Sequence, residues 1–122
     1  MYFLGTVLSI QKLFYKHVGV YIGRGFVLHN HSQRGEEIVT VTQFADGNAI
    51  SVEEVGVADQ VAFLQRVRNV CATPQQYDFL SHNCDHTVSK VRTGVASSSQ
   101  LAEWGFVAVL VVGSALLVKA AR

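Results

Sequence analysis

Residues 17–31, HVGVYIGRGFVLHNH, restrict the possible folds of this chain more than any other stretch. Apolar side chains alternate with other residues on both sides of a Gly-Arg-Gly loop, which is the period of two expected of a β-hairpin. With this loop as the turn, Ile22 faces Phe26 and Val20 faces Leu28, so one side of the hairpin is continuously apolar. A slip of one residue would turn a histidine onto that side. The pattern therefore predicts both the hairpin and its register.

The other side of the predicted hairpin collects three histidines, His17, His29 and His31. The register places Gly19 opposite His29, which is expected to leave room above the sheet because glycine has no side chain. It also places His31 directly opposite His17. Imidazoles on one face can act as bases toward a nucleophile, and the candidate nucleophile is Cys84, further along the chain.

The rest of the first 94 residues is predicted to complete a sheet and to add helices. β-Branched and aromatic residues recur between breaks at Gly and Asp-Gly-Asn, which indicates strands. Apolar spacing in ADQVAFLQRVRNV indicates one helix, and Asn83 and Gly94 mark the start and stop of another. The expected strands are 5–11, 17–22, 26–31, 38–42 and 50–54, and the expected helices are 58–70 and 83–92. Strands followed by helices predict an α+β domain.

The C-terminal part of the chain is far more apolar than the first 94 residues. A polar connector, VASSSQ, precedes the uncharged run WGFVAVLVVGSALLV, residues 104–118. As a helix this run covers roughly 22 Å, less than the ~30 Å hydrocarbon core of a bilayer, but Leu101 and the stem of Lys119 can lengthen it. Trp104 stands where an interfacial aromatic ring is expected. A buried core helix is the alternative, yet so small a domain can hardly cover a helix that is apolar all round. We therefore predict a hydrophobic transmembrane anchor.

Composition and charge narrow the class of protein. The 122 residues suffice for one folded domain, and the net charge of +1 with scattered basic residues excludes an electrostatic footprint for nucleic acid. The N-terminal stretch MYFLGTVLSIQKLF lacks a basic region and a cleavage site, so it is interpreted as mature structure rather than a signal peptide. Two cysteines favour a reducing compartment over a disulfide framework. The predicted organisation is a domain over 1–94, a connector over 95–100 and an anchor over 101–122.

Cys84 lies within the sequence HNCDH. If Asn83 caps a helix, Cys84 stands in its first turn, where unpaired N–H groups and the positive end of the helix dipole favour the thiolate. Cys84, Val88 and Val91 fall on one stripe of that helix, so the thiol is expected at the sheltered end of a packed face. A cysteine, an imidazole base and an orienting polar group are the components of thiol-dependent acyl transfer.

Other interpretations of these residue types are simpler. A cysteine is often inert packing, and we expect that role for Cys71. His82 and His86 flank the helix start and are expected to face solvent. Zinc coordination by these two histidines and Cys84 would need an extended segment and a fourth ligand. The sequence supplies neither, so no metal and no cofactor are expected.

Two segments together carry a family resemblance. HVGVYIGRGFVLH, followed by YDFLSHNCDHTVSKVRTG, resembles the lecithin:retinol acyltransferase-like family, relatives of the NlpC-type cysteine peptidases. The resemblance covers residues 5–94 and implies a circularly permuted papain-like α+β fold, with an antiparallel sheet packed on helices. It implies that Cys84 is the nucleophile, that His17 is the general base and that His29 orients His17. The family spacing of twelve residues selects His29, whereas the hairpin register makes His31 the competitor.

Two residues depart from the family pattern beside Cys84. Asp85 stands where the family usually has Glu, which is a mild change, and Thr87 stands where it usually has Phe. Loss of the aromatic ring at position 87 is expected to loosen the packing that holds the cysteine helix on the sheet.

The expected function is that of a membrane-anchored thiol acyltransferase or phospholipase A. It would act on the acyl esters of glycerophospholipids through an acyl-Cys84 thioester. The alternatives are a cysteine peptidase or amidase of the NlpC type and a non-catalytic membrane-interaction module. The expected partners are a phospholipid and the membrane rather than nucleic acid. The anchor is expected to hold the catalytic domain at the membrane, on the cytoplasmic side.

Overall fold

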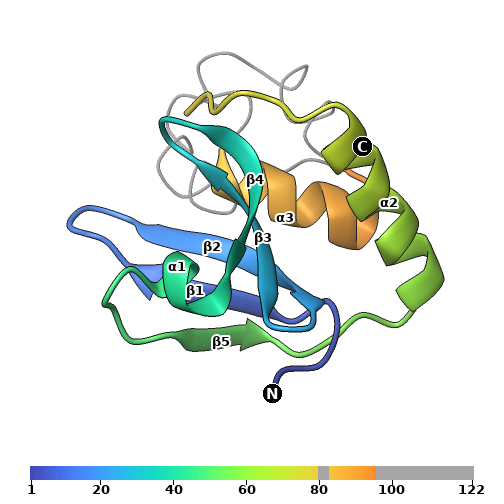
Figure 1. Ribbon diagram of the computed structural model, residues 1–122, viewed down its shortest axis with the longest axis horizontal. Helices are drawn as coiled ribbons and strands as arrows, with labels where there is room; N and C mark the ends of the chain where they lie inside the picture. The colour runs from blue at the N-terminus through green and yellow to red at the C-terminus, as the bar shows by residue number, and fades with distance from the viewer. Residues whose placement is uncertain (80–82, 96–122) are drawn as a thin grey trace, which may run out of the picture.

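A computed structural model of the chain describes residues 1–79 and 83–95 and shows an α+β arrangement (Figure 1). Five antiparallel strands form one sheet in the order β4-β3-β2-β1-β5. The strands are β1 (Val7–Gln11), β2 (Lys16–Gly23), β3 (Phe26–His31), β4 (Gly35–Thr40) and β5 (Ser51–Glu54). The helices are α1 (Val41–Ala45), α2 (Gln60–Ala72) and α3 (Cys84–Thr93). The predicted α+β class is confirmed, and four of the five predicted strands and both longer helices are confirmed within small shifts of their ends.

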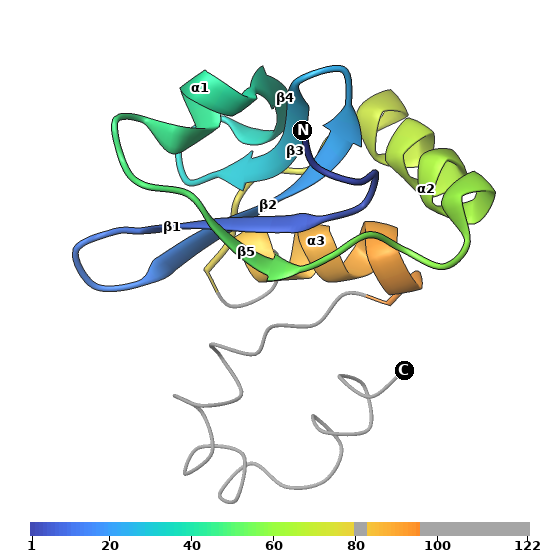
Figure 2. The ribbon, with the colours of Figure 1, turned by 90° about the horizontal axis from the view of Figure 1, so that it is seen from below.

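The two faces of the sheet carry different layers of packing (Figures 1 and 2). On one face, α2 and α3 bury a cluster of mostly valine side chains against β1, β2 and β3. On the other face, the single turn-and-a-half of α1 covers a smaller cluster built around Phe44. Each fully buried large apolar side chain contributes about 1.5–3 kcal/mol. Because both clusters contain such side chains, packing on both faces stabilises the sheet.

The β2–β3 hairpin has the predicted register but a shorter turn. Val20 pairs with Leu28, and Gly19 pairs with His29, as the alternation predicts. The predicted pair of Ile22 and Phe26 is wrong, because Gly23 takes the place opposite Phe26 and a bulge absorbs the extra residue. The chain can turn on only Arg24 and Gly25 because both adopt positive φ, of 56° and 83°.

The segment predicted as a strand over 38–42 is half strand and half helix. Its second half begins α1, because the Thr40 hydroxyl accepts from Gln43 N–H and the Gln43 side chain accepts from Thr40 N–H. This reciprocal capping box is a local start signal for a helix. The short helix brings Phe44 over Gly19, where an added Cβ would lie only 2.7 Å from the Phe44 ring. The expectation of room above Gly19 is therefore wrong, since Phe44 fills it.

Helix α3 begins and ends where its capping residues predict. The Asn83 side chain accepts from His86 N–H, and Gly94 ends the helix with a φ of 84°. Val88 and Val91 are buried with Cys84 in the cluster under the sheet, which confirms the predicted stripe. His86 is not at the surface as expected. It is buried because its Nδ1 accepts from Asn83 N–H and completes the cap.

Thr87 is held by a buried carboxylate rather than by an aromatic contact. Its hydroxyl donates to Glu36 Oε2 over 2.7 Å, and Lys90 Nζ lies 3.0 Å from the same oxygen. Gln75 N–H donates to the other carboxylate oxygen over 2.9 Å. One side chain of β4 thus joins α3 to the loop before it. Where looser packing was expected, a short polar network holds the cysteine helix.

One further prediction is wrong about burial, and two others concern residues that the structure does not describe. Cys71, expected to be buried packing, is exposed on α2. His82 and the predicted anchor over 101–122 lie outside the described residues. Within residues 1–79 and 83–95, no helix is long and apolar enough to cross a membrane.

Candidate active site

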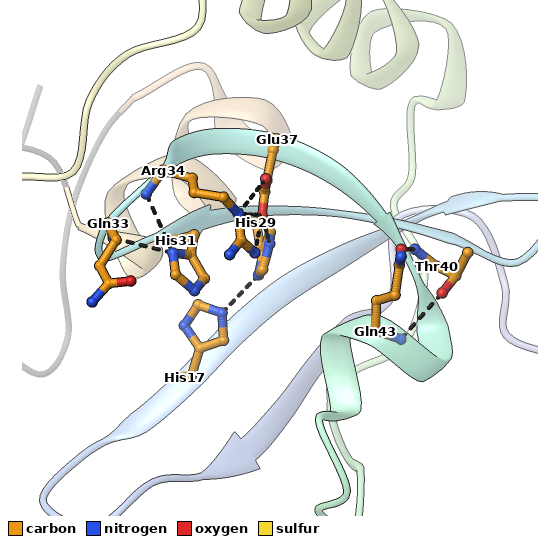
Figure 3. A network of polar contacts seen from close by, with 8 residues as sticks. All are labelled: His17, His29, His31, Gln33, Arg34, Glu37, Thr40 and Gln43. Carbon is orange, nitrogen blue, oxygen red and sulfur yellow. Dashed lines mark hydrogen bonds and ion pairs between the residues drawn. The ribbon is translucent and has the colours of Figure 1, made fainter.

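Two buried histidines from neighbouring strands form the centre of the candidate site (Figure 3). His17 Nε2, on β2, lies 2.8 Å from His29 Nδ1, on β3, and their ring centroids are 5.0 Å apart. His29 Nε2 in turn lies 3.0 Å from Glu37 Oε1, on β4. The β3–β4 register brings Glu37 directly opposite His29. Three adjacent strands therefore build one linear chain of side chains, Glu37–His29–His17.

This chain assigns the protons on both rings. A carboxylate can only accept, so His29 Nε2 carries the hydrogen that it shares with Glu37. The Nδ1 of a neutral His29 is then an acceptor, and His17 Nε2 must donate to it. The lone pair of His17 is left on Nδ1. A histidine held in this tautomer has a single, fixed direction in which it can act as a base.

The far end of the chain is fixed by an arginine. Arg34 Nε donates to both oxygens of Glu37, and its Nη2 lies 2.6 Å from Oε1. The hydrogen bonds from Arg34, together with that from His29, lower the pKa of Glu37 to about 2. Glu37 is therefore ionised at neutral pH. Sequence analysis missed this residue, although counting from His29 around the β3–β4 turn would have placed the two opposite each other.

His31 takes a different position from the one that the hairpin register suggested. The β2–β3 pairing ends at Gly19 and His29, so no strand pair joins His31 to His17. The Nδ1 of His31 accepts from the N–H groups of Gln33 and Arg34 and so organises the β3–β4 turn (Figure 3). The hydrogen-bond partner of His17 is His29.

Burial keeps His17 neutral. The ring is 6% exposed, packs on Phe44 with centroids 5.4 Å apart, and lies beside other basic groups. Burial, with smaller contributions from His29 and Lys12, lowers the pKa of His17 to about 3. Burial also lowers the pKa of His29, and the adjacent Glu37 partly offsets this effect. Both rings are therefore unprotonated bases at neutral pH.

Cys84 is 2% exposed and begins α3. The backbone N–H groups of Val18, Asp85 and Cys84 lie close enough to its sulfur to lower its pKa. Val18 follows His17 along β2, so the thiol is in contact with the backbone next to the candidate base. These N–H groups lower the pKa as expected, but burial outweighs them and raises the pKa of Cys84 to about 11. The expected thiolate is thus a neutral thiol in this structure.

Two tyrosines that the sequence alone did not single out lie within electrostatic range of the thiol. Burial and then the charge on Cys84 raise the pKa of Tyr15. The same two causes, in the same order, raise the pKa of Tyr77 to about 12, with Tyr15 the next contributor. Both phenols are therefore protonated at neutral pH. Tyr15 immediately precedes β2, and Tyr77 lies in the loop between α2 and α3.

A groove of about 420 Å³ lies beside the thiol, between α3 and the β1–β2–β5 side of the sheet. Its lining includes Val18 and Asp85, two of the residues whose N–H groups contact the sulfur. Ion pairs between Lys16 and Glu53 and between Arg92 and Glu54 lie along it. The groove is open and carries both signs of charge.

The raised pKa of Cys84 has a measurable consequence. In a Cys71→Ser background, alkylation of Cys84 by iodoacetamide should be slow at pH 7 and should rise about tenfold per pH unit up to about pH 10. The reason is that only the thiolate reacts and its fraction grows with pH. The rate is measured by mass spectrometry at each pH. A rate that already reaches its plateau below pH 8 would instead indicate a resting thiolate–imidazolium pair.

Comparison with known proteins finds a family model that matches most of the chain. The model of the family described as "Lecithin retinol acyltransferase" matches residues 2–97. Two similar curated proteins are phospholipase A and acyltransferase 3 of Homo sapiens and the protein of the same name from Pongo abelii. Each is 26% identical over 120 residues, which covers 80% of this chain and 74% of the relative.

Proposed function

Because the chain belongs to the lecithin retinol acyltransferase family, we propose that it is a thiol acyltransferase or phospholipase A acting on glycerophospholipid acyl esters. In this proposal Cys84 is the nucleophile, His17 the general base and His29 the residue that orients His17. Similar proteins named phospholipase A and acyltransferase support the substrate class. The permuted papain-like architecture is part of the proposal, supported by a chain order in which the histidine strands precede the cysteine helix.

The first half of the reaction forms a thioester. As the Cys84 sulfur bonds to the ester carbonyl carbon, its proton passes to Nδ1 of His17. The tetrahedral intermediate then collapses, the bond to the glycerol oxygen breaks, and His17 returns the proton to that oxygen. A lysophospholipid leaves and the acyl group stays on sulfur. Because the thiol is neutral at rest, proton transfer accompanies attack rather than preceding it.

The His29–Glu37 pair has a positioning role in this scheme. During proton transfer His17 becomes an imidazolium whose Nε2–H still donates to His29. Ionised Glu37 holds the acceptor nitrogen of His29 toward His17 and offsets the new positive charge. Without Glu37, His29 could take the other tautomer and present a hydrogen where His17 needs an acceptor.

The charge that develops on the carbonyl oxygen needs donors at the sulfur. The backbone N–H groups of Val18, Cys84 and Asp85 already act on the sulfur, and in this proposal they also donate to the oxyanion, which is bonded to the carbon that the sulfur attacks. Such preorganised backbone donors commonly contribute about 2.7–4 kcal/mol of transition-state stabilisation. The mixed charges of the adjacent groove suit a zwitterionic head group.

The second half transfers the acyl group onward. Water attacks the thioester in hydrolysis, whereas a hydroxyl or an amine attacks it in transfer, and His17 takes the proton in either case. The bond to sulfur breaks and the thiol is restored. Residues 101–122 would hold the domain at the membrane, as the uncharged run over 104–118 suggests. In this proposal the domain lies on the cytoplasmic side.

The observation that carries this proposal is the chain of contacts that fixes His17 as a base beside the backbone that touches the Cys84 sulfur. Its test is intact-mass analysis of the full chain after incubation with a diacyl phospholipid. An adduct whose mass follows the acyl chain length should appear on the native chain and be absent from Cys84→Ala. An equal adduct on both chains, or lipid turnover without any adduct, would contradict it. Peptide cleavage in place of lipid turnover would favour the peptidase alternative.

A further inference from the structure

Two large apolar side chains stand at the tip of the β1–β2 hairpin. Lys12 N–H donates to Tyr15 C=O over 2.8 Å, so Leu13 and Phe14 are the two central residues of a tight turn. Leu13 is 85% exposed and Phe14 is 80% exposed. Tight hairpin turns favour glycine, asparagine or aspartate, since such residues match the turn geometry and tolerate water. Folding therefore does not account for Leu13 and Phe14 at this place.

The tip lies on the side of the molecule where the candidate nucleophile begins its helix. In both views the β1–β2 hairpin projects from one end of the domain, and α2 lies at the opposite end (Figures 1 and 2). Helix α3 starts on the hairpin side, so its first residue, Cys84, is the part nearest the hairpin. Tyr15, the residue after Phe14, is close enough to Cys84 for the charge of the thiolate to raise its pKa. The exposed pair is thus on the same side of the domain as the candidate nucleophile.

We propose that Leu13 and Phe14 form a membrane-docking tip that inserts into a phospholipid surface and brings the entrance of the Cys84 site onto it. The choice of lipid as the occupant rests on the proposed function. In that function the ester lies in a bilayer while the Cys84 thiol is only 2% exposed. A docking element on the same side of the domain as Cys84 would hold that side against the bilayer and shorten the path of the ester to the thiol.

The size and charge of the tip favour a lipid surface over a protein partner. A specific protein interface buries about 800 Å² on each side, far more than two side chains can supply. Insertion into the head-group region has no such minimum, since its strength scales with the apolar area that is buried. Lys12 and Lys16 flank the pair, where their stems can lie along the bilayer and their ammonium groups can reach phosphates. Their ion pairs with Asp46 and Glu53 are exposed and easily exchanged.

The direct test places a fluorophore at the tip of the full chain. In a Trp104→Phe background, which removes the only tryptophan, Phe14→Trp is compared with Val61→Trp. Val61 is a matched control because it is 81% exposed on α2, at the other end of the domain. Vesicles of phosphatidylcholine with a minor share of phosphatidylglycerol should shift the emission of the Phe14→Trp chain to the blue. Brominated lipids should quench it. The Val61→Trp chain should show neither effect.

Three results would overturn the proposal. The first is an unchanged Phe14→Trp emission at lipid concentrations at which sedimentation shows that the chain is bound to the vesicles. The second is an equal response from Val61→Trp, which would indicate general adsorption. The third is a blue shift without vesicles that grows with protein concentration, which would mean that the tip contacts a second copy of the chain.

A kinetic test separates this inference from the proposed function. The double variant Leu13→Ser with Phe14→Ser should lose at least about tenfold more rate on vesicles than on a monomeric short-chain phospholipid. Val61→Ser should change neither rate. An equal loss on both substrates would contradict docking. If the native chain forms no acyl adduct on either substrate, the proposed function fails, while the fluorescence result still decides whether the tip enters lipid.

Discussion

Replacing Cys84 with serine is expected to lower the rate of phospholipid turnover by more than about 10³-fold while the fold remains intact. A serine hydroxyl is much harder to deprotonate than a thiol, and a neutral His17 with a pKa lowered to about 3 is a weak base at rest. The two side chains are nearly the same size, so the buried first turn of α3 should keep its packing. Initial rates on vesicles measure the loss, and the thermal unfolding midpoint verifies the fold.

The second cysteine provides the matched control for this substitution. Cys71 is exposed on α2, away from the backbone groups that contact the Cys84 sulfur. Cys71→Ser should therefore keep the native rate within a factor of about two. Retained turnover in Cys84→Ser, together with loss in Cys71→Ser, would show that the wrong thiol has been assigned as the nucleophile.

Replacing His17 with alanine is expected to lower the rate by about 10²–10⁴-fold, because the base that takes the thiol proton is removed. His29→Ala should cost less, since it only leaves His17 free to turn. The double variant should lose little more than His17→Ala alone, because both residues act through one imidazole. The rates are compared on one phospholipid substrate, with folding verified for each variant.

A conservative change at position 29 separates positioning from packing. In His29→Gln the amide oxygen can still accept from His17 Nε2, so part of the activity lost in His29→Ala should return. His31→Ala should cost less than His29→Ala, because His31 accepts from the β3–β4 turn rather than contacting His17. A larger loss at His31, or no recovery in His29→Gln, would contradict the assigned chain of contacts.

The features that sequence analysis predicted correctly depend on short-range rules. The alternation around Val20 and Leu28 has only one register that keeps histidine off the apolar face, and the structure has that register. Asn83 and Gly94 bound α3 because capping depends on residues within one turn. Two local predictions were wrong, the length of the β2–β3 turn and the strand over 38–42, and in both the backbone conformation decided the outcome. Arg24 at positive φ shortened the turn, and the Thr40–Gln43 capping box was a readable signal that was overlooked.

The features that sequence analysis missed depend on residues that meet across the fold. Glu36 and Thr87 are far apart in the chain, and only the packing of α3 against β4 joins them. Tyr77 lies within electrostatic range of Cys84, in a loop that contacts the sheet through Gln75 and Glu36. Phe44 occupies the space above Gly19 because α1 folds back over β2. None of these contacts follows from spacing along the sequence.

The sequence by itself determined the class of fold, the hairpin that gathers the histidines and the helix that begins at Cys84, since each follows from periodicity or capping within a few residues. Only the tertiary structure decided that Glu37 sets the tautomers of His29 and His17. It also decided that Cys84 rests as a thiol with a raised pKa. The helix dipole and N–H groups that favour a thiolate are local and can be predicted. Desolvation opposes them and is larger, and it depends on every element that packs around the sulfur, so it exists only once the whole domain has folded.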